Sequence, residues 1–187
     1  MTRIIGISGS LRKASYNAAL LRAAIELAPK DVEMEIGSIK DIPLYDGDLE
    51  SEQGLPNAVS ALKDRIAAAE GLLLVTPEYN NSIPGVFKNA IDWLSRPSGD
   101  ATRVFGGKPV GVIGATPGGM GTVLAQSAWL AVLRTLGTRP FFGKPLYVSG
   151  AGKVFDSAGR LSDDSVREKL RSYLEDFARF VSIAKVS

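Results

Sequence analysis

Short apolar runs alternate with amphipathic segments along the whole chain. The apolar runs cover residues 4–7, 32–36, 72–75, 110–113 and, more weakly, 146–148. Between and after them, apolar residues recur at helical spacing within residues 20–28, 59–69, 86–94, 132–136 and 166–181. This alternation predicts five strands that are interleaved with five helices.

The predicted strands are apolar on both faces instead of alternating with polar residues, which is typical of a parallel sheet covered by helices on both sides. We therefore expect one three-layer α/β domain over residues 1–187, with loops at residues 41–56 and 99–108. Ser162, Asp163 and Asp164 precede the last helical pattern and predict an acidic N-terminal cap.

Ligands of open parallel sheets bind beyond the carboxyl ends of the strands, so the residues that follow each strand are the candidate site residues. After the first run, Gly9 suits a tight turn, and Ser10, Ser15 and Asn17 add polar groups before a predicted helix start. Arg12 adds a positive charge in the geometry that suits phosphate. The alternative is that Ser15 or Asn17 only caps the helix and Arg12 is solvated. The clustering of these groups favours a phosphate site.

Two further loops follow the third and fourth runs. In residues 76–85, prolines stiffen both ends, and Glu78, Tyr79 and Asn80 place polar and aromatic groups side by side, which favours ligand contact. Pro84 and Gly85 suit a helix start instead. Residues 114–122 form a glycine-rich loop that lets a ligand approach the backbone. Trp93 and Trp129 lie on helical patterns and are expected to pack in the core or at an interface.

Composition excludes several chemistries. The chain has no cysteine and no histidine, which rules out thiolate nucleophiles, Ser-His-Asp relays and the commonest ligands of transition metals. We expect no metal site and no catalytic side chain. The formal charge of +2 has no block of one sign, so neither a nucleic acid nor a membrane surface is an expected partner. The first residues hold too short an apolar run for a signal peptide, and a cytoplasmic location is expected.

The absence of two motifs narrows the range of candidate ligands. Neither the P-loop pattern G-x-x-x-x-G-K-[ST] nor the dinucleotide pattern G-x-G-x-x-G occurs. A mononucleotide with one terminal phosphate, such as FMN, fits the three loops better than a nucleoside triphosphate or a Rossmann dinucleotide.

Two motifs carry a resemblance to a known family. Residues 9–17 read Gly-Ser-Leu-Arg-x-x-Ser-Tyr-Asn, and residues 76–85 read Thr-Pro-Glu-Tyr-Asn-x-Ser-Ile-Pro-Gly, followed by a long matching helix through residue 97. With them the chain closely resembles the NADPH-dependent FMN reductases of the flavodoxin-like fold, including bacterial quinone, azo-dye and chromate reductases. The resemblance covers nearly the whole chain and implies a five-stranded parallel sheet in the order 2-1-3-4-5.

The resemblance also implies a cofactor and its ligands. FMN is the implied cofactor, and NADPH or NADH is the implied co-substrate. The FMN phosphate would be surrounded by Ser10, Arg12, Ser15, Tyr16 and Asn17. The isoalloxazine ring would be lined by Pro77, Glu78, Tyr79, Asn80 and Asn81, with Thr116 near its opposite edge. The chain departs from the family pattern at Trp129-Leu130, where a Leu-Arg pair is common, and at Pro117.

We hypothesise a ping-pong cycle in which NAD(P)H reduces the flavin and a small-molecule acceptor (a quinone, an azo compound, chromate or another metal oxyanion) then takes the electrons. The resemblance implies a homodimer or homotetramer. The alternatives are a flavodoxin-type electron carrier that does not oxidise NAD(P)H and a non-catalytic α/β module. Arg96 and Arg103 are either partners of the NADPH 2′-phosphate or ordinary surface arginines, and residues 41–53 contribute either to the acceptor side or to a subunit contact.

Overall fold

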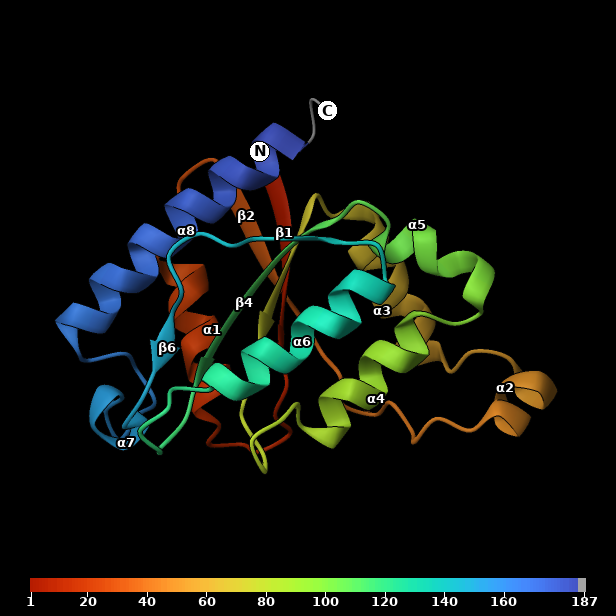
Figure 1. The fold of residues 1–187 in the computed structure, drawn as a ribbon, viewed down its shortest axis with the longest axis horizontal. Coiled ribbons are helices and arrows are strands. Elements are labelled where there is room, and N and C mark those ends of the chain that lie inside the picture. The colour runs from red at the N-terminus through yellow and green to blue at the C-terminus, as the bar shows by residue number, and fades with distance from the viewer. Residues whose placement is uncertain (185–187) are drawn as a thin grey trace.

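The computed structural model describes residues 1–184 and shows a parallel sheet in the order β2-β1-β3-β4-β5, with a sixth strand also paired to β4 (Figure 1). The strands are β1 (Thr2–Ser8), β2 (Val32–Gly37), β3 (Gly71–Val75), β4 (Pro109–Ala115), β5 (Arg139–Pro140) and β6 (Tyr147–Val148). The flavodoxin-like topology is confirmed, and each of the first four strands coincides with a predicted apolar run.

Helices cover both faces of the sheet. They are α1 (Tyr16–Glu26), α2 (Gly47–Gln53), α3 (Asn57–Ala68), α4 (Gly85–Leu94), α5 (Ala101–Phe105), α6 (Val123–Thr135), α7 (Ala151–Val154) and α8 (Asp164–Ala184), with a 3-10 turn at Ser98–Asp100. Helices α1 and α8 pack on one face, and α3, α4 and α6 pack on the other (Figure 1). The predicted acidic cap of α8 is present, because the Asp163 carboxylate accepts a hydrogen bond from the Val166 N–H at 2.9 Å.

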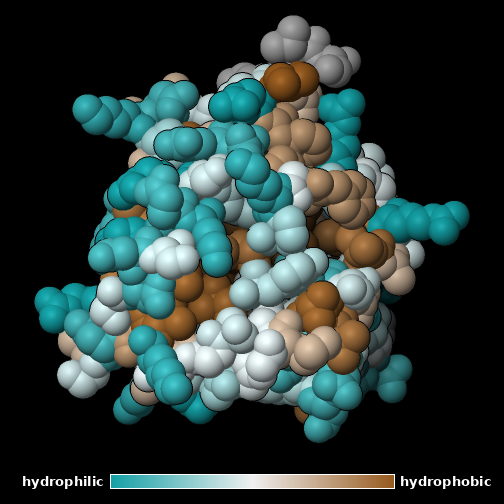
Figure 2. Space-filling view, turned by 60° about the vertical axis from the view of Figure 1, so that its left-hand side comes forward, coloured by the Kyte–Doolittle hydropathy of each residue, from teal (hydrophilic) through white to brown (hydrophobic). Residues whose placement is uncertain are grey.

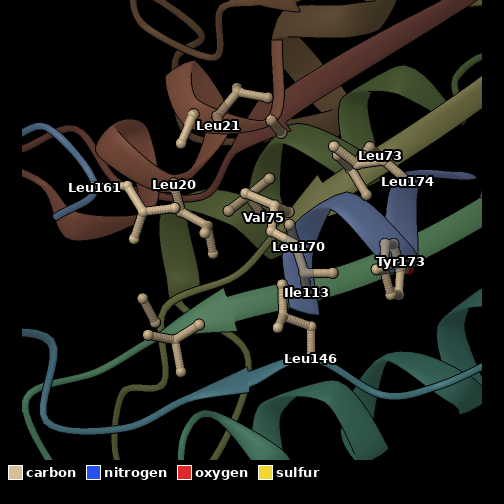
Figure 3. Packing of buried hydrophobic residues seen from close by; sticks show 14 of the residues in the cluster. Leu20, Leu21, Leu73, Val75, Ile113, Leu146, Leu161, Leu170, Tyr173 and Leu174 are labelled. Carbon is tan, nitrogen blue, oxygen red and sulfur yellow. The ribbon is translucent and has the colours of Figure 1, made fainter. Parts of the chain in front are cut away.

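The core is divided by the sheet into two hydrophobic clusters. On β3, Leu73 and Val75 point into the cluster under α1 and α8, while Leu72 and Leu74 point into the cluster under α3, α4 and α6. Figure 3 shows Leu73 and Val75 meeting side chains from α1 and α8. Because both faces of each central strand are buried, its sequence is continuously apolar, which explains why the strands could be predicted.

The fifth strand is shorter and more interrupted than the single run predicted at residues 146–148. The chain first pairs with β4 through β5, where the Phe141 N–H donates to the Val110 carbonyl at 2.8 Å. It then leaves the edge of β4 and returns as β6, beside Gly114 and Ala115. Pro140 and Pro145 explain the break, since neither can donate to a ladder. Figure 2 views the side that carries α8 and β6, where hydrophobic residues are visible between hydrophilic ones.

Both predicted loops contain short helices. Helix α2 lies within residues 41–56, and η1 and α5 occupy residues 98–105. Helix α2 has no buried residue, so it carries no apolar periodicity that would predict it. The one sequence feature that marks the start of α2 is Asp46. Its carboxylate caps the helix by accepting a hydrogen bond from the Asp48 N–H at 2.9 Å.

The segment before and within α2 is docked on α4. The Pro43 carbonyl accepts hydrogen bonds from the Trp93 indole at 2.9 Å and from the Asn89 amide at 2.8 Å. Tyr45 packs edge-on against Trp93, with ring centroids 5.0 Å apart. The Glu50 carboxylate accepts from the Tyr45 hydroxyl at 2.9 Å and from the Arg96 guanidinium at 2.8 Å. Residues 41–53 are thus an ordered strap across one end of α4.

We expect this strap to loosen at acid pH. The Arg96 hydrogen bond lowers the pKa of Glu50 in the folded protein. Its stabilising contribution is therefore present above the unfolded-state pKa of about 4.3 and is lost as the pH falls through the lower folded-state pKa. Denaturant titrations from about pH 7 down to about pH 3 should show that Glu50→Gln destabilises the protein near neutrality and that the difference from wild type shrinks in acid. A difference that is constant with pH would contradict this role.

Candidate functional site

Three loops from the carboxyl ends of β1, β3 and β4 meet in one hollow of about 80 Å³. All residues proposed from the sequence line it except Asn80 and Asn81. The lining residues are Ser10, Arg12, Ser15, Tyr16, Asn17, Pro77, Glu78, Tyr79, Ala115, Thr116 and Pro117. Ala115 and Pro117 were predicted only as parts of the glycine-rich loop, because neither side chain carries a polar or charged group that would suggest a site.

The loop after β1 leads into the N-terminus of α1. The Ser15 hydroxyl caps the helix by accepting from the Ala18 N–H at 3.2 Å. The N–H groups of Tyr16 and Asn17 precede the first intrahelical bond and have no acceptor among the described residues. Free N–H groups at a helix start attract an anion. Capping and phosphate binding are therefore compatible here, since the serine satisfies one N–H and leaves the first two open.

Arg12 curls over this helix start. Its guanidinium donates to the Ala14 carbonyl at 2.8 Å, and its backbone N–H donates to the Ser10 hydroxyl at 3.3 Å. No carboxylate pairs with Arg12 in residues 1–184. The charge is thus available to an anionic ligand. Packing also requires glycine at position 9, because a Cβ there would lie 2.1 Å from a ring carbon of Phe87.

Asn17 is committed to the protein itself. Its amide nitrogen donates to the Ala115 carbonyl at 2.8 Å, and its amide oxygen accepts from the Ala115 N–H at 2.8 Å. The side chain is only 3% exposed. It therefore joins the start of α1 to the end of β4, and its side-chain hydrogen bonds hold the two loops together. Only its backbone N–H remains open toward the hollow.

The loop after β3 makes a tight turn. Tyr79 and Ser82 exchange backbone hydrogen bonds of 3.2 and 3.0 Å, and the residues between them, Asn80 and Asn81, have φ angles of 50° and 61°. Two successive left-handed residues define a type I′ turn, in which asparagine is favoured. The turn geometry explains both asparagines and carries their side chains outside the lining of the hollow. Tyr79 is 46% exposed.

Glu78 crosses from this loop to the next helix. One carboxylate oxygen accepts from the N–H groups of Leu124 at 2.9 Å and Ala125 at 3.0 Å, in the first turn of α6. A carboxylate at a helix N-terminus is favourable both as a cap and in the field of the helix dipole. Glu78 thus lines the hollow and also fixes the second loop to α6, a structural role that its sequence position did not indicate.

The loop after β4 is held by a hydrogen bond to β6 and by another within the loop. The Thr116 N–H donates to the Val148 carbonyl at 2.9 Å, and the Thr116 hydroxyl accepts from the Gly118 N–H at 3.3 Å. Gly114 lies where a Cβ would be 2.2 Å from the Thr76 carbonyl oxygen and 2.3 Å from the Thr122 hydroxyl. Gly119 has no neighbour within 4 Å of such a Cβ. Gly121 has a φ of 59°, and a Cβ there would lie 2.8 Å from the Tyr147 carbonyl carbon. The glycine-rich pattern therefore combines glycines that the fold requires with others that leave space open.

Buried polar side chains lie at the ends of β1 and β3, next to the loops of the site. The Trp129 indole donates to the Thr76 hydroxyl at 3.1 Å, and Thr76 is fully buried. Trp93 and Trp129 are both fully buried, as the helical pattern predicted. Ser8, the last residue of β1, has a buried hydroxyl with no hydrogen-bond partner among residues 1–184. A buried polar group without a partner is unusual in a native fold, and Ser8 does not line the hollow.

The two arginines considered for a 2′-phosphate are already paired. Arg96 contacts Glu50 at 2.8 Å, and Arg103 contacts Asp100 at 2.6 Å. Asp100 also pairs with Lys63 at 2.8 Å, and Lys63 is buried and donates to the Arg96 carbonyl. Arg103 and then Lys63 hold the pKa of Asp100 well below its usual range. These ion pairs and hydrogen bonds hold the segment that follows α4 in place.

Neither a metal cluster nor a membrane-spanning helix occurs in the described part of the chain. Residues 1–184 contain no cluster of three or more acidic, histidine or cysteine side chains placed to hold a metal ion. Among the helices of the same residues, none has the length and apolar character needed to cross a bilayer.

Comparison with known proteins identifies relatives over the full extent of the fold. The family model described as NADPH-dependent FMN reductase matches residues 2–153, which includes all three loops. The NAD(P)H-dependent FMN reductase of Pseudomonas aeruginosa is 43% identical over 92% of this chain and 91% of its own. The 2-hydroxy-1,4-benzoquinone reductase of a Burkholderia species is 38% identical over 98% of each chain.

A solved structure agrees with these sequence relatives. The flavoenzyme FerB, an NAD(P)H:(acceptor) oxidoreductase from Paracoccus denitrificans, superposes with a TM-score of 0.87. It is 34% identical in sequence and the match covers 98% of this chain and 99% of FerB. The likeness thus extends from the sheet to the loops at its carboxyl edge.

Proposed function

Because the chain belongs to the NADPH-dependent FMN reductase family, we propose that the hollow at the carboxyl edge of its sheet binds FMN and that the protein is an NAD(P)H-dependent quinone reductase. The observation that carries the proposal is the meeting of an anion-binding loop with a stiff, open ring loop in one hollow. The quinone substrate class rests on the similarity to 2-hydroxy-1,4-benzoquinone reductase.

The residues present fit FMN. The free N–H groups of Tyr16 and Asn17 and the unpaired charge of Arg12 suit a single terminal phosphate. Pro77 and Tyr79 line the other end of the hollow, where the tight turn that follows Tyr79 keeps the loop short.

Bound FMN would supply the two-electron redox chemistry, which explains how a chain without histidine or cysteine can be an oxidoreductase. The protein's part is to bind and orient. Asn17 and Glu78 hold the three loops in fixed positions through hydrogen bonds to Ala115 and to the first turn of α6. Such preorganisation lets backbone groups of the second loop contact a ring edge without rearrangement.

The site is open on one side, and Tyr79 is half exposed at its rim. We propose that NAD(P)H and the acceptor occupy this open side in turn, which is a ping-pong order. The same openness would admit flat acceptors other than quinones, and azo compounds and chromate belong to this wider proposal. We also expect a homodimer or homotetramer, a cytoplasmic location and a single FMN-binding domain, and light scattering of the purified protein would test the assembly.

An anaerobic stopped-flow experiment tests the reductase proposal. FMN-loaded protein would be mixed with NADPH, and with NADH in parallel, while the visible absorbance of oxidised flavin is followed. We expect rapid bleaching, followed by recovery of the absorbance when a benzoquinone is added in a second mix. Flavin that remains bound but oxidised with both nucleotides would overturn the proposal and support an electron carrier instead.

Replacing Arg12 tests the phosphate end of the site. We expect Arg12→Ala to weaken FMN binding by about tenfold, the typical cost of one charge-assisted hydrogen bond to phosphate. Riboflavin, which lacks the phosphate, should bind wild type and variant equally in a fluorescence titration. With FMN and NADPH both saturating, the rate of bleaching should be unchanged. Equal FMN affinity in the two proteins would contradict the assignment.

A further inference from the structure

A second, larger hollow of about 730 Å³ opens from the phosphate end of the first. The two share Arg12, Ser15 and Tyr16 in their linings. From there the second hollow runs along α1 past Ala19 to Arg22, and its other wall is formed by residues between 152 and 159. It therefore lies beyond the phosphate loop, on the side away from the ring loop, and the proposed FMN does not account for it.

The charge of this hollow is positive. Lys13 makes no hydrogen bond or ion pair with the described residues, and Arg22 makes one contact of 3.5 Å with the Gly159 carbonyl. The acidic side chain in its lining, Asp156, is engaged by Arg160 at 2.9 Å. Arg12, Lys13 and Arg22 thus surround the space with charges that protein carboxylates do not neutralise.

The far wall is held in place without a ligand. The Asp156 carboxylate accepts from the N–H groups of Ala158 at 2.9 Å and Arg160 at 2.8 Å, which fixes the turn. Tyr16 stacks on Phe155, with ring centroids 5.8 Å apart, and joins this wall to α1. Small residues such as Ala19 and Gly152 leave the space between the walls open. The hollow is therefore a formed groove that has an apolar floor and a basic rim.

We propose that this groove, which we call the basic groove, binds an adenosine phosphate group. The proposal rests on FMN binding in the adjoining hollow. An adenosine phosphate combines an anion for Lys13 and Arg22 with a flat base for the apolar floor. In FAD this group is the AMP half, which extends from the flavin phosphate. In NADPH it is the 2′-phosphoadenosine end, whose 2′-phosphate is absent from NADH.

Adenosine 2′,5′-bisphosphate is the direct probe, because its binding requires neither flavin nor turnover. Titration calorimetry would compare wild type with a Lys13→Ala/Arg22→Ala variant and with a control, Lys30→Ala/Arg134→Ala, which removes the same charge from exposed sites elsewhere. We expect the groove variant to bind about tenfold more weakly than wild type and the control to be unchanged. Absence of binding to wild type at millimolar concentration, or equal binding to all three, would overturn the proposal.

Two further measurements distinguish whether FAD or NADPH supplies the adenosine phosphate. If FAD supplies the group, the groove variant loses affinity for FAD and keeps its affinity for FMN in flavin fluorescence titrations. If NADPH supplies it, KM for NADPH rises in the FMN-loaded variant and KM for NADH does not. Failure of wild type to bind FMN would instead overturn the proposed function. Parallel loss of FMN, FAD and both nicotinamide nucleotides would show damage to the shared loop and overturn the groove assignment.

Discussion

Gly114→Ala is expected to destabilise the protein by about 3 kcal/mol, the upper end of the usual cost of overpacking. A Cβ at this position would lie 2.2 Å from the Thr76 carbonyl oxygen and 2.3 Å from the Thr122 hydroxyl. The first of these is a backbone atom at the end of β3, so it can move only if β3 and β4 separate. Two of the three loops of the site begin at these strand ends, and we expect FMN affinity to fall more than tenfold as well.

Gly119→Ala is the matched control in the same loop. A Cβ there has no neighbour within 4 Å, and the residue does not have a positive φ. We expect its free energy of unfolding to stay within about 0.5 kcal/mol of wild type. Urea unfolding of both variants without flavin, followed by FMN titration, makes the comparison. Equal stability of the two variants would show that the ends of β3 and β4 can yield where the structure shows close contact.

The central sheet could be predicted from the sequence because burial on both faces leaves a local signal. Residues 72–75 are apolar without interruption, and they form a strand whose alternate side chains enter both core clusters. The strand in the fifth position of the sheet, beside β4, could not be predicted in the same way. There Pro140 and Pro145 interrupt the ladder, and only the pairing with β4 defines the two short strands. Helix α2 was missed because none of its residues is buried.

The candidate site could be predicted as a set of loops but not as a set of side-chain roles. The rule that ligands gather at carboxyl strand ends placed all three loops at one edge, as the structure shows. Whether a polar side chain faces a ligand or the protein depends on contacts between distant segments. Glu78 was considered only for the ligand, yet it caps a helix 46 residues later. The turn at Asn80 and Asn81 does have a local signal, because an Asn-Asn pair favours two successive left-handed residues.

Asn17→Ala is expected to cost about 3 kcal/mol in the protein without flavin. The side chain is buried and makes two hydrogen bonds of 2.8 Å, one to the Ala115 N–H and one to the Ala115 carbonyl. Its removal leaves a donor and an acceptor unsatisfied at the end of β4, and each buried orphan costs about 1–3 kcal/mol. Asn57→Ala, at an exposed position in the first turn of α3, should change stability little.

Asn17→Asp separates this structural role from phosphate binding. A carboxylate still accepts from the Ala115 N–H, but it has no proton to donate and lies against the Ala115 carbonyl. That contact favours the protonated form and raises the pKa of the new group above its unfolded value of about 3.9. The variant should therefore be least destabilised, relative to wild type, below that unfolded-state pKa, and its deficit should grow as the pH rises through the folded-state value. If Asn17 served only the phosphate, both variants would unfold like wild type in the absence of FMN. Unfolding curves of flavin-free protein as a function of pH therefore decide whether the side chain that joins α1 to β4 supports the site from within the fold or contacts the ligand directly.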